Sequence, residues 1–460
     1  MSGIIGPHQA FSGPALSSQP QKFLPLRNGT TLFNLGGEYY YTSRGTPDTT
    51  SLLELSLREP RSCGSCFSPS IPLGSGALLL GMRTGTLWHT DGSNRPQGTR
   101  VVKEAIWPVY DITRYPITEN ALTPLGQDAV LFFTFERHPN WDRGHNYDKY
   151  LRRLWRTDGT QAGTTLVKSF SGQDIIRSNN MSVRMEGLTA HRKLAFFMAN
   201  DGEHGSELWR TDGTESGTFM VKDLVAGVAD ASIRNITSAR HHVYFTFTDQ
   251  SGVHLAKTHG SPEDAVDIAI LPNQSGIAHK FVAVNDDIYF ALGRDLYRSN
   301  GRPGDLRRLG QFAQSSLDRY SNVYPYGATT SDWPAAMTAF GNHLYFVGHK
   351  RSNDPLQVWR VDSKTSKAQV VTPKFKVHVS RANDVGFSVH GGRLFLSVMD
   401  RVGQKGGIFE LIERGNSIRW VQHTKMSAKE LRVAGDKMYF AGLDDQNGEE
   451  PRVMPLPKRP

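Results

Sequence analysis

Cysteine and long apolar runs are almost absent from this sequence. Only 2 of its 460 residues are Cys, which excludes a disulfide-stapled scaffold and a zinc site built from four cysteines. No stretch of 18 apolar residues occurs, so the sequence predicts no membrane-spanning helix. Hydrophobic residues still make up 38% of the chain, and Gly is frequent at 45 positions. The composition therefore indicates a Gly-rich globular protein with a core, and not a disordered chain.

A concentrated basic surface is missing as well. The chain has 53 Lys and Arg against 44 Asp and Glu, a formal net charge of +9, and its longest basic clusters are pairs such as Arg152-Arg153 and Arg307-Arg308. Proteins that bind nucleic acid gather these residues in runs or on one face. We therefore predict no specific nucleic-acid partner, although the charge allows a general preference for acidic partners.

Charged residues are absent from the first 21 positions, and the first acidic residue is Glu38. A secretory signal needs a basic start and a continuous apolar segment, which Pro7, Gly13 and Pro14 interrupt here. We expect residues 1–21 to form a flexible tail. The alternative is an export signal that bypasses the general secretory route, like the leaders of bacterial effectors delivered into host cells. The predicted location is accordingly either cytoplasmic or exported by such a route.

Internal repeats dominate the rest of the chain. One phrase recurs as TLWHTDGS (86–93), RLWRTDGT (153–160) and ELWRTDGT (207–214), and weaker copies follow at 295–301 and 357–363. An aromatic triplet such as VYF or LYF precedes each copy, and a strand-like phrase such as TTLVKSF (164–170) follows it. Successive triplets lie about 50 residues apart, the length of one propeller blade.

These phrases consist of strand formers bounded by turn residues. Each unit reads as four short strands, so we predict an all-β fold, a single β-propeller over residues 22–457 with four-stranded blades. The repeat count allows eight or nine blades, and eight is preferred because nine is rare. The last unit lacks a fourth strand, and the segment FLPLR (23–27) is expected to supply it from the N-terminal side.

The run GSELWRTDGTESGTFMVKDL (205–224) resembles the ELWxxDGT repeat found in many bacterial proteins. The similarity is good at 153–168, partial at 86–103, and weak beyond residue 250. It implies a propeller-like repeat protein of bacterial origin. It implies no defined reaction, no catalytic residues and no cofactor.

The repeated aromatic and acidic residues have a structural interpretation. We expect Trp88, Trp155, Trp209 and Trp359 to pack between blades. We expect Asp91, Asp158, Asp212 and Asp362 to hydrogen-bond within their own turns. Two segments, 200–203 and 445–449, faintly resemble calcium loops, but turn chemistry explains them better, and no metal site is predicted. Cys63 and Cys66 are interpreted as loop residues.

Four long insertions are expected on one face of the ring, because the connections of a four-stranded blade alternate between its two faces. They are residues 104–122, 136–149, 170–186 and 311–335. Aromatic residues and Arg are common anchors of interfaces. The predicted partner-binding residues are therefore Trp107, Tyr110, Arg114, Tyr115, Trp141, His145, Tyr147, Tyr320, Tyr324, Tyr326 and Trp333.

Three functions remain open at this stage. The preferred one is a non-catalytic, monomeric binding platform that presents these loops to a protein or carbohydrate partner, because no linear catalytic motif occurs. The second is a propeller enzyme of the lyase or hydrolase type, in which His138, His145, Arg114 and Glu119 converge at the channel mouth. The third is a lectin with one sugar site per blade.

Overall fold

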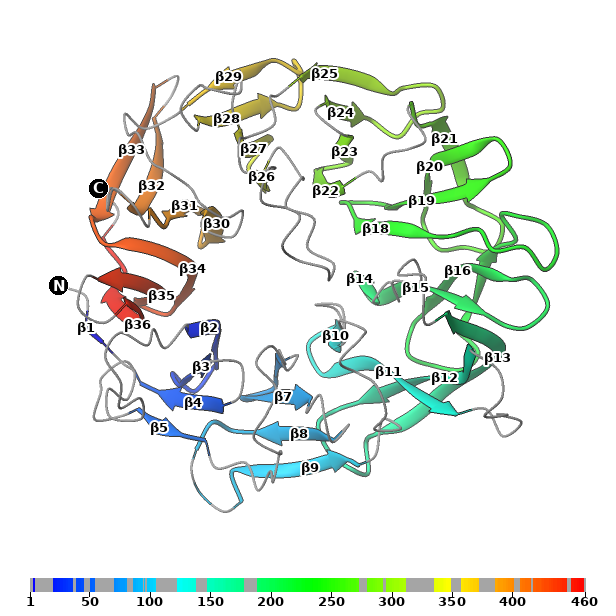
Figure 1. Cartoon of the computed structure of the whole chain (residues 1–460), viewed down its shortest axis with the longest axis horizontal. Helices are drawn as coiled ribbons and strands as arrows, with labels where there is room; N and C mark the ends of the chain where they lie inside the picture. The colour runs from blue at the N-terminus through cyan, green and yellow to red at the C-terminus, as the bar shows by residue number, and fades with distance from the viewer. Residues whose placement is uncertain are drawn as a thin grey trace.

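The computed structural model is a closed ring of nine antiparallel sheets around a central opening (Figure 1). Each sheet contains four strands. The prediction of an all-β propeller with four-stranded blades is confirmed, whereas the preference for eight blades was wrong. Residues 20–53 form a complete first blade of their own, although this segment carries no TDGT phrase to mark it.

The structure describes residues 3–4, 20–35, 39–44, 50–53, 70–80, 86–93, 95, 97–104, 122–137, 147–177, 188–272, 279–292, 295–311, 335–348, 357–371, 385–400, 406–414, 417–444 and 448–458. None of these residues belongs to a helix of the length and apolarity needed to cross a membrane.

The blades follow the chain in order. Blade 1 contains β2 (Pro20–Pro25), β3 (Thr31–Leu35), β4 (Tyr39–Ser43) and β5 (Ser51–Leu52). Blade 2 contains β6 (Ser70–Leu73), β7 (Gly76–Leu80), β8 (Leu87–Thr90) and β9 (Thr99–Lys103). Blade 3 contains β10 (Leu122–Leu125), β11 (Ala129–Arg137), β12 (Tyr147–Thr157) and β13 (Thr165–Arg177). Blade 4 contains β14 (Thr189–His191), β15 (Leu194–Asn200), β16 (Ser206–Thr211) and β17 (Phe219–Lys222). Blade 5 contains β18 (Arg234–Ser238), β19 (Val243–Asp249), β20 (Gly252–Thr258) and β21 (Val266–Ile270).

The second half of the ring has the same organisation. Blade 6 contains β22 (His279–Val284), β23 (Asp287–Leu292), β24 (Asp295–Ser299) and β25 (Arg307–Gln311). Blade 7 contains β26 (Ala335–Phe340), β27 (His343–Gly348), β28 (Gln357–Asp362) and β29 (Ala368–Val370). Blade 8 contains β30 (Val385–His390), β31 (Arg393–Val398), β32 (Gly407–Arg414) and β33 (Ser417–Thr424). Blade 9 contains β34 (Ser427–Ala434), β35 (Lys437–Asp444), β36 (Gly448–Pro455) and, from the other end of the chain, β1 (Gly3–Ile4).

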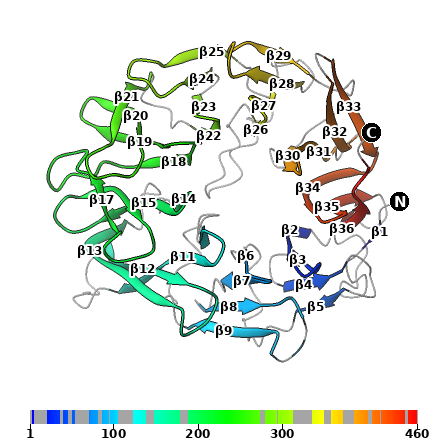
Figure 2. The same ribbon diagram turned by 180° about the vertical axis from the view of Figure 1, so that it is seen from behind.

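The first strand of each blade lies at the central opening and the fourth at the rim, as both views of the ring show (Figures 1 and 2). Every strand pairs with the next one along the chain, so each blade is a simple meander. Turns between strands one and two, and between three and four, therefore lie on one face, which we call the turn face. Connections between strands two and three, and between blades, lie on the other, which we call the insertion face.

The ring is closed by β1, which pairs with β36 through Gly3 opposite Val453 and Ile4 opposite Arg452. Closure by an N-terminal strand is confirmed, but the segment 23–27 does not provide it. That segment instead contributes to β2, the inner strand of blade 1, which pairs with β3. Figure 1 accordingly shows the two chain ends beside each other at blade 9.

The apolar core lies between neighbouring blades. Phe197, Phe245, Phe290 and Phe346 are fully buried on the second strands of four successive blades. Trp88, Trp209 and Trp359 are buried and Trp155 is partly buried, which confirms their predicted packing role. Each such side chain contributes about 1.5–3 kcal/mol through burial, so the aromatic repeat is the main source of ring stability.

A second kind of contact connects the repeated sequence phrases of adjacent blades. The Lys103 ammonium of blade 2 lies 3.8 Å from the ring centre of Trp155 in blade 3. The Lys168 ammonium of blade 3 lies 5.7 Å from the ring centre of Trp209 in blade 4. These cation–π contacts explain why the Val-Lys phrase accompanies the Trp phrase. In blade 5 the third strand has Ala256 opposite Phe245, in the position that Trp209 holds opposite Phe197.

The TDGT phrase builds a hydrogen-bonded turn that is best seen in blade 4. The Asp212 Oδ1 atom accepts from the Thr214 backbone N–H at 2.9 Å and from its hydroxyl at 2.6 Å. The Thr214 hydroxyl bond lowers the pKa of the Asp212 carboxyl. Thr211 accepts from the Gly213 N–H at 2.9 Å, and its hydroxyl lies 2.7 Å from that of Thr218. The predicted turn role of this Asp is thus confirmed.

Asp91, Asp158 and Asp362 have the same role in their own turns. Asp91 accepts from the Ser93 N–H, Asp158 from the Thr160 N–H, and Asp362 from the Lys364 and Thr365 N–H groups.

Removing the first four residues should weaken the ring at blade 9. The β1 pairing is lost, and β36 keeps one unpaired edge. With each lost hydrogen bond contributing about 0.5–1.5 kcal/mol, urea titration should show a free energy of unfolding lower by about 1–3 kcal/mol. A chain lacking only residues 1–2 is the control and should unfold like the full chain. Equal stability of both truncated chains would contradict closure by β1.

The second glycine of the TDGTxxGT turn should not tolerate a side chain. A Cβ atom at Gly217 would overlap the Asp212 carboxylate, so Gly217→Ala should cost about 1–3 kcal/mol of unfolding free energy. The control is Gly386→Ala, where the nearest atom to the new Cβ is the Ser397 Oγ at 3.5 Å. Thermal unfolding should separate the two variants, and equal midpoints would refute this explanation of the motif.

Candidate functional site

Most of the predicted partner-binding residues lie outside the described part of the chain. They are Trp107, Tyr110, Arg114, Tyr115, Trp141, His145, Tyr320, Tyr324, Tyr326 and Trp333. The enzyme candidates His138 and Glu119 and the two cysteines lie outside it too. Tyr147 begins β12, where its backbone lies opposite Arg177 at the far end of β13.

All four predicted insertions include strand residues, and two of them overlap strands by more than their end residues. Residues 136–137 belong to β11, 147–149 to β12 and 170–177 to β13. The β12–β13 ladder extends three residues beyond the last pair of β11 with β12, which joins Arg137 to Tyr150. Part of what reads as loop in the sequence therefore lengthens blade 3.

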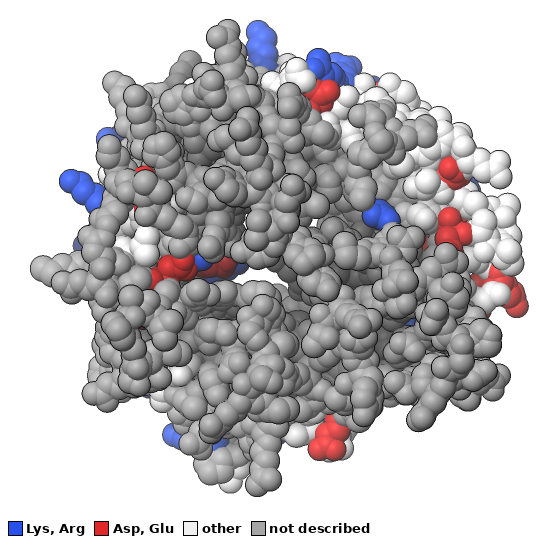
Figure 3. All heavy atoms as spheres, in the orientation of Figure 1, with Lys and Arg blue, Asp and Glu red and all other residues white. Residues whose placement is uncertain are grey.

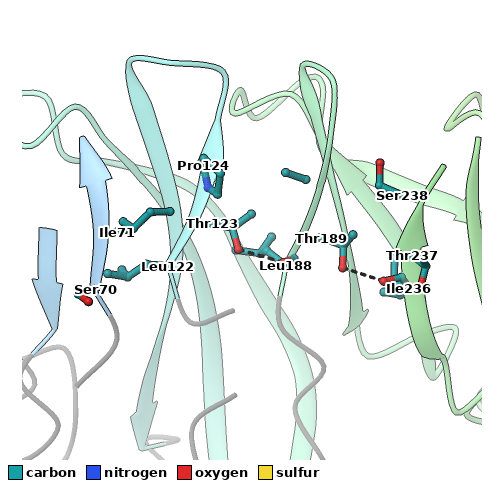
Figure 4. Close-up of a pocket in the computed structure, with 11 residues that line it drawn as sticks. Ser70, Ile71, Leu122, Thr123, Pro124, Leu188, Thr189, Ile236, Thr237 and Ser238 are labelled. Carbon is teal, nitrogen blue, oxygen red and sulfur yellow. Dashed lines mark hydrogen bonds between the residues drawn. The ribbon is translucent and has the colours of Figure 1, made fainter. Parts of the chain in front are cut away.

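The described part of the central wall contains a cavity of about 460 Å³ along the inner strands of blades 2 to 5 (Figure 4). Its lining alternates hydroxyl and apolar side chains from β6, β10, β14 and β18. The residues are Ser70, Ile71, Leu122, Thr123, Pro124, Leu188, Thr189, Ala190, Ile236, Thr237 and Ser238.

Threonine hydroxyls in this cavity connect one inner strand to the next. The Thr123 hydroxyl donates to the Leu188 carbonyl at 2.9 Å, and the Thr189 hydroxyl donates to the Ile236 carbonyl at 3.1 Å (Figure 4). These hydrogen bonds connect blade 3 to blade 4 and blade 4 to blade 5. Because their hydrogens are used in this way, the two hydroxyl oxygens keep only acceptor capacity.

A β-bulge shapes the blade 5 side of the cavity. The β18–β19 register shifts between Arg234 and Thr237, and Asn235 takes a φ of 57°. Thr237 donates its hydroxyl to the Asn235 carbonyl at 2.9 Å. A bulge inserts an extra residue and re-aims the side chains that follow it. The backbone of β18 is thus bent where Ile236 and Thr237 line the wall.

Among the described residues, the cavity lining includes no Asp, Glu, His, Lys, Arg or Cys side chain. These residues offer hydrogen bonds and apolar contact and no charged group. Blade 9 differs, because Lys429 on its inner strand forms a buried ion pair with Glu449, with 2.8 Å between Nζ and Oε2. In Figure 3 acidic and basic side chains are visible beside the central opening, on the side where Figure 1 places β30 and β34.

Several other buried charges of the described residues are paired within the fold. Glu410 binds Arg393 through two bonds of 2.6 Å and His423 through one of 2.8 Å. Arg393 also donates to the Pro457 carbonyl at 2.8 Å, which ties the C-terminal segment to blade 8. Glu207, the first residue of the ELW phrase, accepts from the Leu224 and Val225 N–H groups, while burial raises its pKa to about 8.

Turn chemistry also explains the segment 200–203. The Asp201 Oδ1 atom accepts from the backbone N–H groups of Glu203 and His204, each at 2.9 Å. Asn200 accepts from the Gly202 N–H at 2.7 Å. No group of three or more His, Cys, Asp or Glu side chains in the described ranges is arranged to hold a metal ion. Residues 445–447 lie outside those ranges.

Removing one hydrogen bond between blades should lower the free energy of unfolding measurably. Thr189→Val replaces the hydroxyl by a methyl group and leaves the Ile236 carbonyl without its partner, so the free energy of unfolding should fall by about 1 kcal/mol. The matched control is Thr338→Val on the inner strand of blade 7, outside the cavity. If urea titration showed that Thr189→Val loses no more unfolding free energy than Thr338→Val, the hydrogen bond from Thr189 to the Ile236 carbonyl would contribute nothing to stability.

Comparison with known proteins supports the fold alone. No protein-family model and no curated protein sequence matches the chain. Among solved structures, it is similar to prolyl oligopeptidase B from Galerina marginata, with a TM-score of 0.40 and 13% identity over 85% of this chain and 55% of that one. A manganese complex of an oligogalacturonate lyase has a TM-score of 0.39 and 14% identity, over 77% of this chain and 89% of that one.

The β-propeller domain of the Trilobed protease from Pyrococcus furiosus gives a TM-score of 0.32 and 9% identity, over 73% of this chain and 94% of that domain. The chain spans about half the length of the prolyl endopeptidases that it matches, 50% in one case and 55% in the other. These likenesses are distant, and it is the strand order of the nine sheets that shows the chain to be a β-propeller.

Proposed function

We propose that this chain is a non-catalytic binding platform whose insertion face holds a protein or carbohydrate partner. The observation that carries the proposal is a difference between the two faces: one is flanked by the long segments, and the other carries contacts between blades. By strand order, the four long segments of the sequence all join a second strand to a third, or one blade to the next. The strand ends that flank each of these segments therefore lie on the insertion face.

The turn face is occupied by contacts that hold the ring together. Between blades 6 and 7 the Asn285 amide donates to the Asn342 Oδ1 at 3.2 Å. Between blades 2 and 3 the Arg100 guanidinium donates to the Gly159 carbonyl at 3.2 Å. A Cβ atom at Gly213 would overlap the Leu125 side chain of the preceding blade. Turns with such contacts cannot vary freely, so the opposite face is the one available for a partner.

The uncharged cavity supports binding over catalysis. A general acid–base site needs titratable groups within hydrogen-bond reach of a substrate. The described lining residues include none, although His191 contacts the lining through the Ser238 hydroxyl. The hydroxyl groups and apolar side chains of the lining suit a neutral ligand that forms hydrogen bonds. A partner segment entering the channel from the insertion face would meet this wall.

The relation to ELWxxDGT repeat proteins belongs to the same proposal. It rests on the residues 205–224, whose Trp, Asp, Gly and Thr have the connected structural roles described above. On this view, the repeat provides the scaffold and the insertions provide specificity. Export of the chain as a bacterial effector is a further expectation of this proposal.

The test compares two sets of surface variants. Glycan and peptide arrays identify a ligand for the full chain, and biolayer interferometry then measures its affinity. Trp141→Ala combined with Tyr324→Ala should weaken binding at least tenfold, while the melting temperature stays within about 1 °C because surface substitutions seldom cost more than 0.5 kcal/mol. Lys364→Ala, on an exposed turn of the turn face, is the control and should bind normally.

Other outcomes would replace the proposal. Loss of stability in the double variant equal to its loss of binding would make both residues packing residues. Turnover of the ligand that His145→Ala abolishes without weakening binding would establish the enzyme. Binding of a glycan with more than one site per chain would establish the lectin.

A further inference from the structure

Four histidines gather on the turn face where blades 4, 5 and 6 meet. His191 ends β14, His241 and His242 form part of the turn between β18 and β19, and His259 lies in the turn between β20 and β21. The His242 ring centre lies 5.0 Å from that of His259 and 6.4 Å from that of His241. Imidazoles this close repel one another once they are protonated.

Asp286, in the turn between β22 and β23 of blade 6, connects this cluster to the next blade. Its carboxylate accepts from the His241 backbone N–H at 2.8 Å and lies 2.5 Å from His241 Nδ1. Its backbone carbonyl accepts from the Tyr244 hydroxyl at 2.6 Å. His242 lies farther away, with 3.8 Å between its Nε2 and the Asp286 Oδ1. Asp286 is therefore hydrogen-bonded to His241 and not to His242.

The same histidines connect blade 5 to blade 4. The His191 Nδ1 lies 2.9 Å from the Ser238 hydroxyl oxygen, and the Arg192 guanidinium donates to the Arg240 carbonyl at 2.9 Å. The Arg240 N–H in turn donates to the Asn285 carbonyl of blade 6 at 2.8 Å. A continuous path of hydrogen bonds thus runs across three blades through the cluster.

The charges that face the cluster are unbalanced in acid. Lys257 on β20 faces His242, and Arg192 faces His191. The carboxylates are Asp286 and Asp264, whose Oδ2 lies 3.6 Å from His259 Nδ1. Protonation of His191 and His242 adds two cations to Lys257 and Arg192, so that four cationic groups then face these two carboxylates.

Burial sets the sign of the effect. Desolvation, with the nearby Arg192, lowers the pKa of His191, and desolvation, with the nearby Lys257, lowers the pKa of His242. Below about pH 6.5 the unfolded chain therefore binds more protons at these two positions than the folded chain does. The stability of the junction is present above that pH and is lost as the pH falls below it.

We infer that the junction of blades 4, 5 and 6 is a pH-sensitive joint that opens locally when its buried histidines are protonated. The response is expected to be local, because these four histidines meet at this junction. His191 and His242 lose their packed positions when they are protonated. The joint is independent of the proposed partner face, since it lies on the opposite side of the ring.

Native-state hydrogen exchange of the full chain between pH 7.5 and 5.5 tests this inference. The amides of Arg240 and His241 should lose at least tenfold in protection factor, after correction for intrinsic exchange rates. The Ser363 amide, which donates to the Asn342 carbonyl of the same face at 3.1 Å, is the internal reference and should change little. The double variant His191→Gln, His242→Gln should abolish the extra loss.

Two further variants control the result. His204→Gln removes an exposed histidine on the insertion face, and it should leave the acid response unchanged. A hydrogen bond to the Asp201 carboxylate raises the pKa of His204. His259→Gln removes a repelling charge from a side chain that is 61% exposed, and it should reduce the response even if the double variant does not fold. An unchanged response in His259→Gln, or equal loss of protection in all blades, would overturn the inference.

Discussion

Apolar packing between neighbouring sheets is the constraint on which this ring depends. A single four-stranded meander exposes two faces, and only another blade on each side can cover them both. The large aromatic residues on the second and third strands fill this space, and Lys103 and Lys168 extend the contact by covering the Trp of the next blade. The hydrogen bonds of Thr123 and Thr189 add contacts between neighbouring blades, and the TDGT turn joins the third and fourth strands of one blade.

The sequence carried enough information for the fold because each blade repeats the same contacts. Trp209, Asp212 and the lysine of the next phrase could be interpreted from their recurrence alone. The blade count could not be obtained in this way. Blade 1 lacks the TDGT phrase, and β1 is only two residues long, so neither leaves a periodic signal. The choice of 23–27 as the closing strand failed because an inner strand and a closing strand have the same composition.

The candidate sites were harder to predict from the sequence than the fold. The cavity lining joins residues from four blades that are 166 positions apart between Ser70 and Ile236, and single Ser and Thr residues give no sequence signal for such a meeting. The bulge at Asn235 was equally hidden, since its φ of 57° follows from packing and not from a turn motif. The histidine pair 241–242 was visible, but its meeting with His191 and His259 needs the ring to be closed. Linear motifs identify contacts that repeat from blade to blade, whereas the cavity and the histidine cluster each combine unrepeated residues of several blades.

The pairing of Gly3 with Val453 has a consequence for biosynthesis. Gly3 and Val453 are 450 positions apart, so all nine blades must be synthesised before the two strands can meet. Until then β1 must stay free of other partners, and β36 lacks its neighbour. Closure is therefore the step with the largest loop entropy, and the nascent ring behaves as an open arc whose last sheet is exposed to other strands. Any factor that holds the emerging N-terminus would decide when the arc becomes a ring.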